Sequence, residues 1–389
     1  MPESRLVARA EALGPTLRAR IPLMRELRKI PNETIADLED AGFFRMLQPA
    51  SQGGMEVHPQ TFFDVQIALA TACPSTAWVM SVLAVHAWQL ALFPEHAQRD
   101  VWGENQGARI ASSYAPTGVI ERAEGGYRVS GRWSFSSGCD HSQWIFLGGM
   151  VPPGNGHDAP QMRTFLLPRE DWQIEDNWHV VGLEGTGSKD IVVPGAFVPE
   201  HRTHKLVDGF TGRSPGLDDN DSTLFRLPFG QIFVRSVSTS IIGVLQGALD
   251  AYLHVARQKV AASSGGAVKL DPVSQMVCAD ARATLDEVKL VLHRNMAELW
   301  AAADVGDSLA VERRAQFRYE SARAVERCAD AVDRLFTASG GRSIFVGGDL
   351  QRFFQDAHAI RAHFANKPEG PGRNLGGVLL GVENTDLFL

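Results

Sequence analysis

The stretch SIFVGGDLQRFFQDAHAIRAH (Ser343–His363) shows a clear helical pattern near the end of the chain. Gly347 and Gly348 predict a turn, and Asp349 follows at the position of a helix N-cap, where its carboxylate would accept a backbone N–H. The apolar residues after it recur at helical spacing and form one stripe: Leu350, Phe353, Phe354 and Ala357. His358 falls at the edge of this stripe, so we expect it to be half-buried, with a pKa that its surroundings set near neutrality. The position also suits a structural histidine that bonds a backbone carbonyl.

Three long segments with helical periodicity precede this helix: Phe229–Ser263, Pro272–Val305 and Ser308–Ser339. Each runs for about 30 residues, near the upper length of helices in globular proteins. Helices of this length need partners along their whole length, so we expect a four-helix bundle that the helix at 349–366 completes. Apolar stripes on several faces would also suit contacts between subunits.

The chain before this bundle divides into two parts. Residues 1–105 indicate helices, and Ala77–Phe93 is expected to be a buried helix rather than a membrane span, because polar side chains interrupt it. Near Ala108 the period changes from 3.6 to 2, and short runs separated by Gly, Pro and Asp predict strands. The expected fold is therefore mainly α with a middle β domain. It has an N-terminal helical domain (1–105), a central β-barrel or sandwich (106–205) and a C-terminal helical bundle (206–389), which begins with a polar surface loop at 206–226.

Composition sets further limits. The net charge of the 389 residues is -7, which gives no reason to expect nucleic acid or an anionic membrane as a partner. The N-terminus, MPESRLVARAEALG, lacks the apolar core of a secretory signal, which favours the cytoplasm. Four scattered cysteines indicate reduced thiols rather than disulfides or a zinc site, and no metal site is expected.

Three segments, in this order, resemble the acyl-CoA dehydrogenase superfamily. GGYRVSGRWSFSSGCDHSQWIFL (125–147) is similar to the strand–turn–strand beside the flavin ring of that superfamily. WHVVGLEGTGSKDIVVPGAFVPEHR (178–202) is similar to its second β-domain signature. SGGRSIFVGGDLQRFFQDAHA (339–359) resembles its Gly-Gly turn and Arg-x-x-x-Asp helix. The resemblance covers essentially the whole chain and implies the acyl-CoA dehydrogenase fold.

The glutamate base of the dehydrogenases has no counterpart. The region that should carry it reads HFANKPEGPGRN (363–374), with Glu369 in a Pro-Gly loop, and SSYAPTG (112–118) replaces the superfamily's Gly-Ser-Asp motif. Removal of an α-proton from an acyl thioester then lacks an obvious base. The chain is instead similar to the oxygenase components of two-component flavin-dependent monooxygenases, which include p-hydroxyphenylacetate 3-hydroxylases and phenolic secosteroid hydroxylases. The similarity lies in SSYAP, FSSGCDH, VVGLEGTGS and QDAHA.

This resemblance implies an aromatic monooxygenase that ortho-hydroxylates a phenol through a flavin C4a-hydroperoxide. Reduced flavin (FMNH2 or FADH2) would reach it by diffusion from a separate NAD(P)H:flavin reductase, O2 would be the second substrate, and the enzyme would be a homotetramer. Three alternatives stay open. They are an N- or S-oxygenase of the same family, an acyl-CoA dehydrogenase with a displaced base, and a helical oligomer that only binds flavin or a partner.

The resemblance also implies roles for individual residues. Ser137 would accept a hydrogen bond from flavin N5–H, with Ser136 as the alternative if the strand register slips by one residue. His86 would polarise the phenol toward phenolate, and Ser112 would meet the substrate. His358 would be a second acid or base, or the partner of the peroxide. Which of the two histidines is the base stays open.

Further residues are expected around the flavin and the substrate. Tyr114 would line the substrate pocket or fill the core, and Phe135 would stack on an aromatic ring or pack internally. Arg257 would reach the flavin across a subunit interface, although a solvated arginine is an equal alternative. The turn at Gly185 and Thr186 would offer backbone N–H groups to the flavin phosphate.

Overall fold

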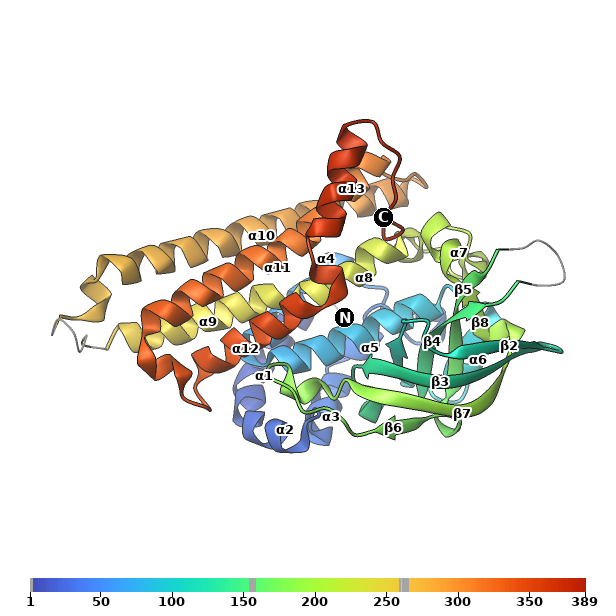
Figure 1. Ribbon diagram of the computed structural model, residues 1–389, viewed down its shortest axis with the longest axis horizontal. Helices are drawn as coiled ribbons and strands as arrows, with labels where there is room; N and C mark the ends of the chain where they lie inside the picture. Colours follow the sequence, from blue (N-terminus) through green and yellow to red (C-terminus); the bar gives the residue numbers. More distant parts are fainter. Residues whose placement is uncertain (1–2, 154–158, 259, 261–265) are drawn as a thin grey trace.

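The computed structural model describes residues 3–153, 159–258, 260 and 266–389. An elongated helical bundle lies at one end of the molecule and the β strands lie at the other (Figure 1). The N-terminal part of the chain forms six helices: α1 (Ser4–Ala19), α2 (Ile21–Leu27), α3 (Asn32–Asp40), α4 (Pro59–Ala72), α5 (Pro74–Leu90) and α6 (Glu95–Trp102). Every residue of α5 is buried, and this helix packs against α4 on one side and against strand β1 on another. The expectation of a buried helix in this region is confirmed.

Eight strands form two four-stranded sheets in the described part of the chain. The first sheet has the order β1-β4-β5-β8 and the second β2-β3-β7-β6. The strands are β1 (Ile110–Ser113), β2 (Val119–Ala123), β3 (Gly126–Ser136), β4 (Trp144–Val151), β5 (Gln161–Pro168), β6 (Gln173–Glu175), β7 (Lys189–Pro199) and β8 (Thr203–Lys205). Strand β1 pairs with β4 in parallel, and the other neighbouring strands in the two sheets are antiparallel.

Strands β3 and β7 are longer than their sequences predict. Proline and glycine were expected to separate strands, but β7 is continuous from Lys189 to Pro199 through the Pro194-Gly195 dipeptide. The register of β3 against β7 shifts between Val129 and Gly131, opposite this dipeptide. Such an irregularity accommodates a proline, which has no N–H to donate to the neighbouring strand.

The expected surface loop at 206–226 contains short helices. They are α7 (Leu206–Thr211) and the 3-10 turns η7 (Pro215–Asp218) and η8 (Thr223–Arg226). The Asn220 side chain donates to the carbonyls of Ala91 and Gly216, and Leu224 and Phe225 are buried. The segment is therefore packed onto the helices, although its polar, glycine-rich composition predicted a surface loop.

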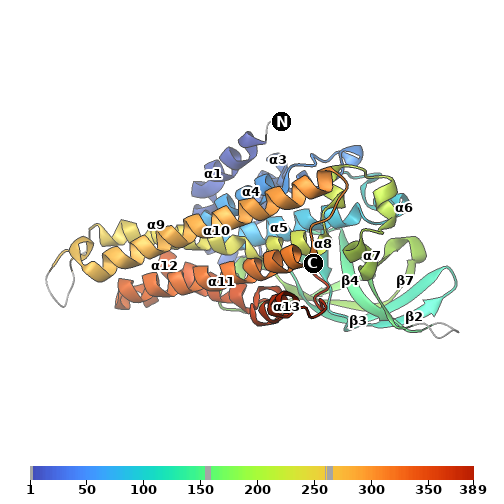
Figure 2. The ribbon, with the colours of Figure 1, turned by 90° about the horizontal axis from the view of Figure 1, so that it is seen from above.

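The C-terminal part forms α8 (Phe229–Ser238), α9 (Ser240–Ala256), α10 (Pro272–Asp304), α11 (Val311–Ser339), α12 (Asp349–Ala362) and α13 (Glu369–Leu379). Helices α9, α10, α11 and α12 lie side by side as the expected four-helix bundle (Figure 2). The fold class predicted from the sequence is confirmed: helices, a middle layer of strands, and a helical bundle.

The first long helix differs from its prediction because it is interrupted at Thr239 and ends at Ala256. The carbonyl of Ser236, which a continuous helix would bond to Ser240, instead accepts hydrogen bonds from the side chains of Gln66 (2.7 Å) and Ser81 (3.0 Å). Part of the remaining predicted range, to residue 263, lies outside the described residues. Within those residues, Phe229–Ala256 is the one segment long and apolar enough to cross a membrane, but 94% of its most apolar window is buried, so it forms core.

The N-cap prediction for α12 is wrong. Gly348 occupies the cap, and Asp349 is the first helical residue. The carboxylate of Asp349 accepts from the guanidinium of Arg352 at 3.0 Å instead of from a backbone N–H. The apolar stripe faces the neighbouring helices as expected, since Leu350, Phe353 and Ala357 are buried.

Candidate functional site

A row of hydrogen-bonded hydroxyl groups lies where the end of β3 meets the turn before β7. The Oγ atoms of Ser137 and Ser188 are 2.7 Å apart, and Ser188 Oγ is 2.7 Å from Thr186 Oγ1. The indole N–H of Trp78, on α5, donates to Ser137 Oγ at 3.1 Å. Ser188, Thr186 and Trp78 are buried, whereas Ser137 is only partly covered. Ser137 is therefore the accessible end of a buried network, and a hydroxyl oxygen can accept a second hydrogen bond there.

The two residues before Ser137 have different surroundings. Ser136 is fully buried, and its Oγ has no hydrogen-bond partner among the described residues. Phe135 has a φ of +66°, a strained conformation for a residue with a bulky side chain, and its side chain is 73% exposed. The backbone thus holds an aromatic ring at the surface beside the Ser137 hydroxyl. This arrangement of an aromatic surface and a hydrogen-bond acceptor fits the ring of a flavin.

Helix α12 holds the turn that carries this row. The backbone N–H of Leu183 donates to Asp356 Oδ1 at 2.6 Å, and Leu183 itself has a φ of +49°. Gly182 has a φ of +78°, and a Cβ there would lie 2.2 Å from the carbonyl oxygen of Gln355. Only glycine allows so close an approach to α12. Burial raises the pKa of Asp356 to about 6, and Arg352 Nη1 lies 3.9 Å from its other oxygen.

A second group of polar side chains surrounds His86, farther along α5. His86 Nδ1 lies 2.7 Å from the carbonyl oxygen of Ile110, which can only accept, so Nδ1 carries the proton. Nε2 of His86 lies 2.9 Å from Ser112 Oγ and is therefore the acceptor of that hydroxyl. Burial lowers the pKa of His86 to about 4, so the ring is neutral at neutral pH.

Tyr114 joins this second group. Its ring meets the His86 ring edge-on at 6.0 Å, and its hydroxyl donates to the side-chain oxygen of Gln89. Burial raises the pKa of Tyr114 above its usual range, so this phenol stays protonated. The structure thus brings together His86, Ser112 and Tyr114, the three residues expected to meet the substrate.

His363 is a site residue that sequence reasoning missed. Its ring meets the ring of Trp78 edge-on at 5.6 Å, which places it beside the indole that holds Ser137. Nδ1 of His363 accepts the backbone N–H of Ala365 at 3.3 Å, so the neutral ring carries its proton on Nε2. Burial, and then the positive charge of Arg318, lower its pKa to about 4. The signal was its position at the start of the segment that replaces the dehydrogenase glutamate.

His358 has different neighbours. Its Nε2 lies 2.8 Å from Asp333 Oδ1 on α11, its ring packs on Phe354, and its side chain is 40% exposed. Asp356 faces elsewhere, as expected, and is not its partner. These contacts lie between α11 and α12 and do not include Trp78 or Ser137. A role for His358 in catalysis stays a prediction that its contacts do not support.

The expected flavin-phosphate contacts are partly corrected. The N–H of Gly185 donates to Ser75 Oγ at 3.3 Å, and the residue is buried because Met24 packs against it, so this amide is not free for a phosphate. The hydroxyl of Thr186 belongs to the row described above. Arg257 is exposed at the end of α9, where its contact with a flavin stays a prediction. Glu369 is exposed at the start of α13, which agrees with the lack of a dehydrogenase base.

The two polar groups share helix α5. Trp78 and His86 are eight residues apart on it, a rise of about 12 Å. One group offers an exposed aromatic ring and a hydroxyl acceptor, and the other offers a neutral imidazole with an acceptor nitrogen. A helical bundle packed on two small sheets, with an exposed aromatic ring beside a hydroxyl acceptor and with Glu369 on the surface, fits a flavin-dependent oxygenase on the acyl-CoA dehydrogenase fold.

Comparison with known proteins identifies the family. Residues 236–368 match the family model described as acyl-CoA dehydrogenase, C-terminal domain. The chain is 42% identical over 365 residues to the flavin-dependent monooxygenase, oxygenase subunit HsaA, of Rhodococcus jostii (strain RHA1), covering 93% of this chain and 94% of the relative. It is 34% identical to the FADH2-dependent resorcinol hydroxylase, oxygenase component, of Rhizobium sp. (strain MTP-10005), covering 98% and 95%. The crystal structure of 3-HSA hydroxylase from Rhodococcus sp. RHA1 superposes with a TM-score of 0.94 at 40% identity, covering 99% of this chain and 98% of that one.

The chain therefore belongs to the family of flavin-dependent monooxygenase oxygenase subunits. The expected family and enzyme class are confirmed. As an oxygenase component it implies a flavin reductase as its partner, since reduced flavin is its reductant.

Proposed function

We propose that this enzyme hydroxylates a phenol at the carbon ortho to its hydroxyl, with reduced flavin and O2. The observation that carries this proposal is the opposite tautomers of two neutral histidines. His86 presents an unprotonated Nε2 toward Ser112, and His363 presents a protonated Nε2 beside Trp78. One ring is set to accept a proton and the other to donate a hydrogen bond. Phenol oxygenation needs one group of each kind.

His86 is the proton acceptor. Ser112 already donates to His86 Nε2, so a phenol that donates to Ser112 Oγ would be polarised toward phenolate through that hydroxyl. This polarisation raises the electron density at the ortho carbon, which makes it a better nucleophile. N- or S-oxygenation needs no proton acceptor, so the His86–Ser112 pair favours a phenolic substrate.

Ser137 and Phe135 would hold the flavin, and His363 would lie near it because its ring contacts Trp78, which bonds Ser137. When bound, reduced flavin with O2 supplies the oxygen atom that is transferred. Ser137 Oγ would accept the N5–H, and its hydrogen bonds to the Trp78 indole and to Ser188 support this role because they fix the orientation of the hydroxyl. The Nε2–H of His363 would donate to an oxygen on the same side. These two hydrogen bonds would hold the N5 proton and the Nε2 proton in place until the substrate reacts.

The flavin is FADH2, as in the name of the resorcinol hydroxylase, with FMNH2 as the alternative. An NAD(P)H:flavin reductase supplies it by diffusion in the cytoplasm. We propose a homotetramer. Exposed apolar side chains recur along α10 and the turn before it and support contacts between subunits, since a second subunit would cover them: Leu270, Val273, Met276 and Leu290.

The test uses chemically reduced FAD, O2 and the purified enzyme without a reductase. We expect substituted phenols to yield ortho-diphenols together with oxidised FAD and water, and hydrogen peroxide only from turnovers in which no oxygen is transferred. Transfer of oxygen to thioethers or amines, with phenols left unchanged, would overturn the proposal. If turnover required direct contact with a reductase, the delivery of reduced flavin by diffusion would be overturned, but the proposed hydroxylation would not.

A further inference from the structure

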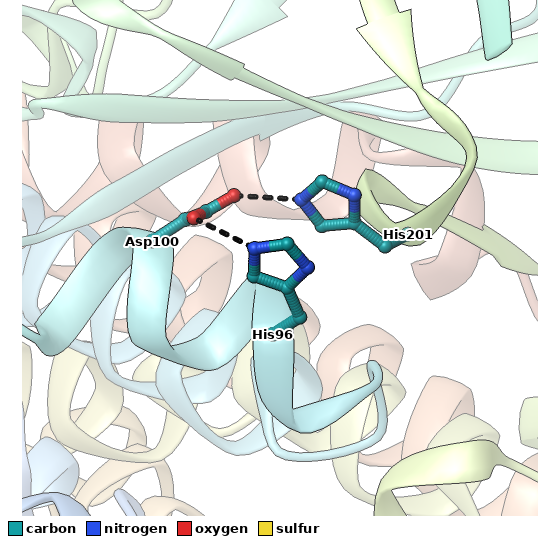
Figure 3. A group of neighbouring side chains, drawn as sticks. All are labelled: His96, Asp100 and His201. Atoms are coloured by element: carbon teal, nitrogen blue, oxygen red, sulfur yellow. Dashed lines mark hydrogen bonds and ion pairs between the residues drawn. The ribbon is translucent and has the colours of Figure 1, made fainter. Parts of the chain in front are cut away.

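Three side chains of metal-binding type meet on elements other than those that carry the row of hydroxyls. His96 and Asp100 lie one turn apart on α6, and His201 lies in the 3-10 turn η6 (Glu200–Arg202) between β7 and β8 (Figure 3). Their ligand-type atoms all lie within 4.8 Å of one another. The proposed oxygenation uses none of them.

The two imidazoles converge on one carboxylate. His201 Nε2 lies 2.8 Å from Asp100 Oδ2, and His96 Nε2 lies 3.8 Å from Asp100 Oδ1. The rings are stacked, with centroids 3.9 Å apart and planes within 7° of parallel. Figure 3 shows both nitrogens turned toward Asp100. The distance from His96 is too long for a hydrogen bond, so Oδ1 faces a ring nitrogen without bonding it.

The carboxylate is held in place from its other side. The Nε of Arg202 lies 2.6 Å from Asp100 Oδ2, and the guanidinium stacks over the ring of Trp144 at 5.1 Å. The hydrogen bonds from Arg202 and His201 to Oδ2 therefore hold the carboxylate in one orientation, as the surroundings of a ligating carboxylate must do.

We propose that His96, His201 and Asp100 Oδ1 bind one divalent transition-metal ion, with Zn2+ as the representative of the class. On a tetrahedral zinc ion neighbouring ligand atoms lie about 3.3 Å apart, within the range of separations seen here. The His96 side chain is 61% exposed, so a rotation of this ring closes the site without moving the backbone. Two imidazoles and one carboxylate favour zinc, copper or nickel over magnesium or calcium.

The ion would join α6 to the turn between the two sheets. Oδ2 keeps its bond to Arg202, while His201 exchanges its hydrogen bond to Asp100 for the metal. One or two water molecules would complete the coordination. Because imidazoles bind metals in their neutral form, the affinity should fall in acid.

Calorimetric titration of the chelator-treated full-length enzyme with Zn2+ tests this site. We expect one ion per chain, and His96→Ala and His201→Ala should each weaken binding by at least about tenfold. His254→Ala, which removes an exposed histidine at the end of α9, is the matched control and should bind as the wild type does. Titration with Mg2+ should show no binding.

A second readout separates lost ligation from misfolding. Co2+ should give the visible absorption of a four- or five-coordinate ion in the wild type and lose it in His96→Ala, while the thermal unfolding of both proteins in chelator should coincide. Zn2+ binding that is unchanged in His96→Ala and His201→Ala, or undetectable at millimolar Zn2+, would overturn the site.

Discussion

The backbone N–H of Leu183 and the carboxylate of Asp356 meet at 2.6 Å, and this bond joins the strand layer to the helical bundle. The residues involved are far apart in sequence, yet the bond orients the turn from which Thr186 and Ser188 extend. Those two hydroxyls in turn fix Ser137, the residue proposed to meet the flavin. The strained φ of Leu183 persists because the bond to Asp356 compensates it.

Removal of this carboxylate should loosen both the fold and the site. Asp356→Ala leaves the buried N–H of Leu183 without its acceptor, so we expect a loss of about 1–3 kcal/mol in the free energy of unfolding. More of the O2 consumed should appear as hydrogen peroxide, because Ser137 is no longer held. Urea denaturation and a peroxide assay measure the two effects.

Asp349→Ala is the matched control, because Asp349 also bonds Arg352 but is exposed and does not contact Leu183. It should leave stability and coupling nearly unchanged. Asp356→Asn keeps an acceptor oxygen and should restore most of the coupling. If Asp349→Ala and Asp356→Ala changed the free energy of unfolding and the peroxide yield equally, the bond from Leu183 to Asp356 would not be the cause of either effect.

Adjacent serines give a direct test of the flavin position. Ser137→Ala removes the acceptor of the Trp78 indole and the partner of Ser188, so oxidised flavin should return sooner after reduced flavin and enzyme are mixed with O2. We expect the lag before that absorbance rises to shorten by about tenfold or more. Ser136→Ala, which removes a buried hydroxyl without a partner, should keep the wild-type lag. The reverse pattern would place the flavin on the other side of β3.

The two histidines of the α12 region should differ sharply in their effect on hydroxylation. His363→Ala removes the Nε2–H beside Trp78, so the yield of hydroxylated product per reduced flavin should fall by about tenfold or more. His358→Ala breaks only an ion pair with Asp333 on a partly exposed face and should lower the yield by less than about twofold. A large loss in His358→Ala, with His363→Ala unaffected, would restore His358 as the catalytic histidine.

These residues show what the sequence could and could not predict. Helical spacing correctly placed Leu350, Phe353 and Ala357 inside, because burial of one helix face is a local property. It also drew attention to His358, which lies on the same helix. His363 lies after the end of α12, in an extended conformation that turns its ring toward Trp78, and a helical period says nothing about a residue beyond the helix.

Other features depended on partners far away in the sequence. Asp356 bonds the N–H of Leu183, 173 residues away, and no local pattern around Asp356 indicates this partner. The interruption at Thr239 has no local signal, since the apolar pattern continues across it; side chains from α4 and α5 cause it by bonding the Ser236 carbonyl. The family motifs, by contrast, correctly predicted the fold and the enzyme class. Their order along the chain can be read from the sequence, whereas contacts between distant residues cannot.

The pH dependence of stability should report the buried His86. Its pKa is about 4 in the folded protein and 6.5 for a free histidine, so between these values the unfolded chain binds a proton that the native state does not. The free energy of unfolding should therefore fall as the pH is lowered from 6.5 to 4, by up to about 3 kcal/mol for this one residue. His86→Asn removes the titration and can keep an N–H donor to Ile110, so its stability should fall less steeply over the same range.

Urea denaturation at several pH values compares the two proteins. Asp356 acts in the opposite direction, because its folded pKa is raised to about 6 and its contribution is lost as the pH rises through that value. It is present in both proteins and cancels in the difference between them. The buried His204, whose pKa burial also lowers to about 4, provides a second case, and His204→Asn should flatten the profile in the same way. Profiles of wild type and His86→Asn that stay parallel from pH 6.5 to 4 would mean that His86 titrates in the folded enzyme as it does in the unfolded chain, and this would contradict its burial as a neutral ring.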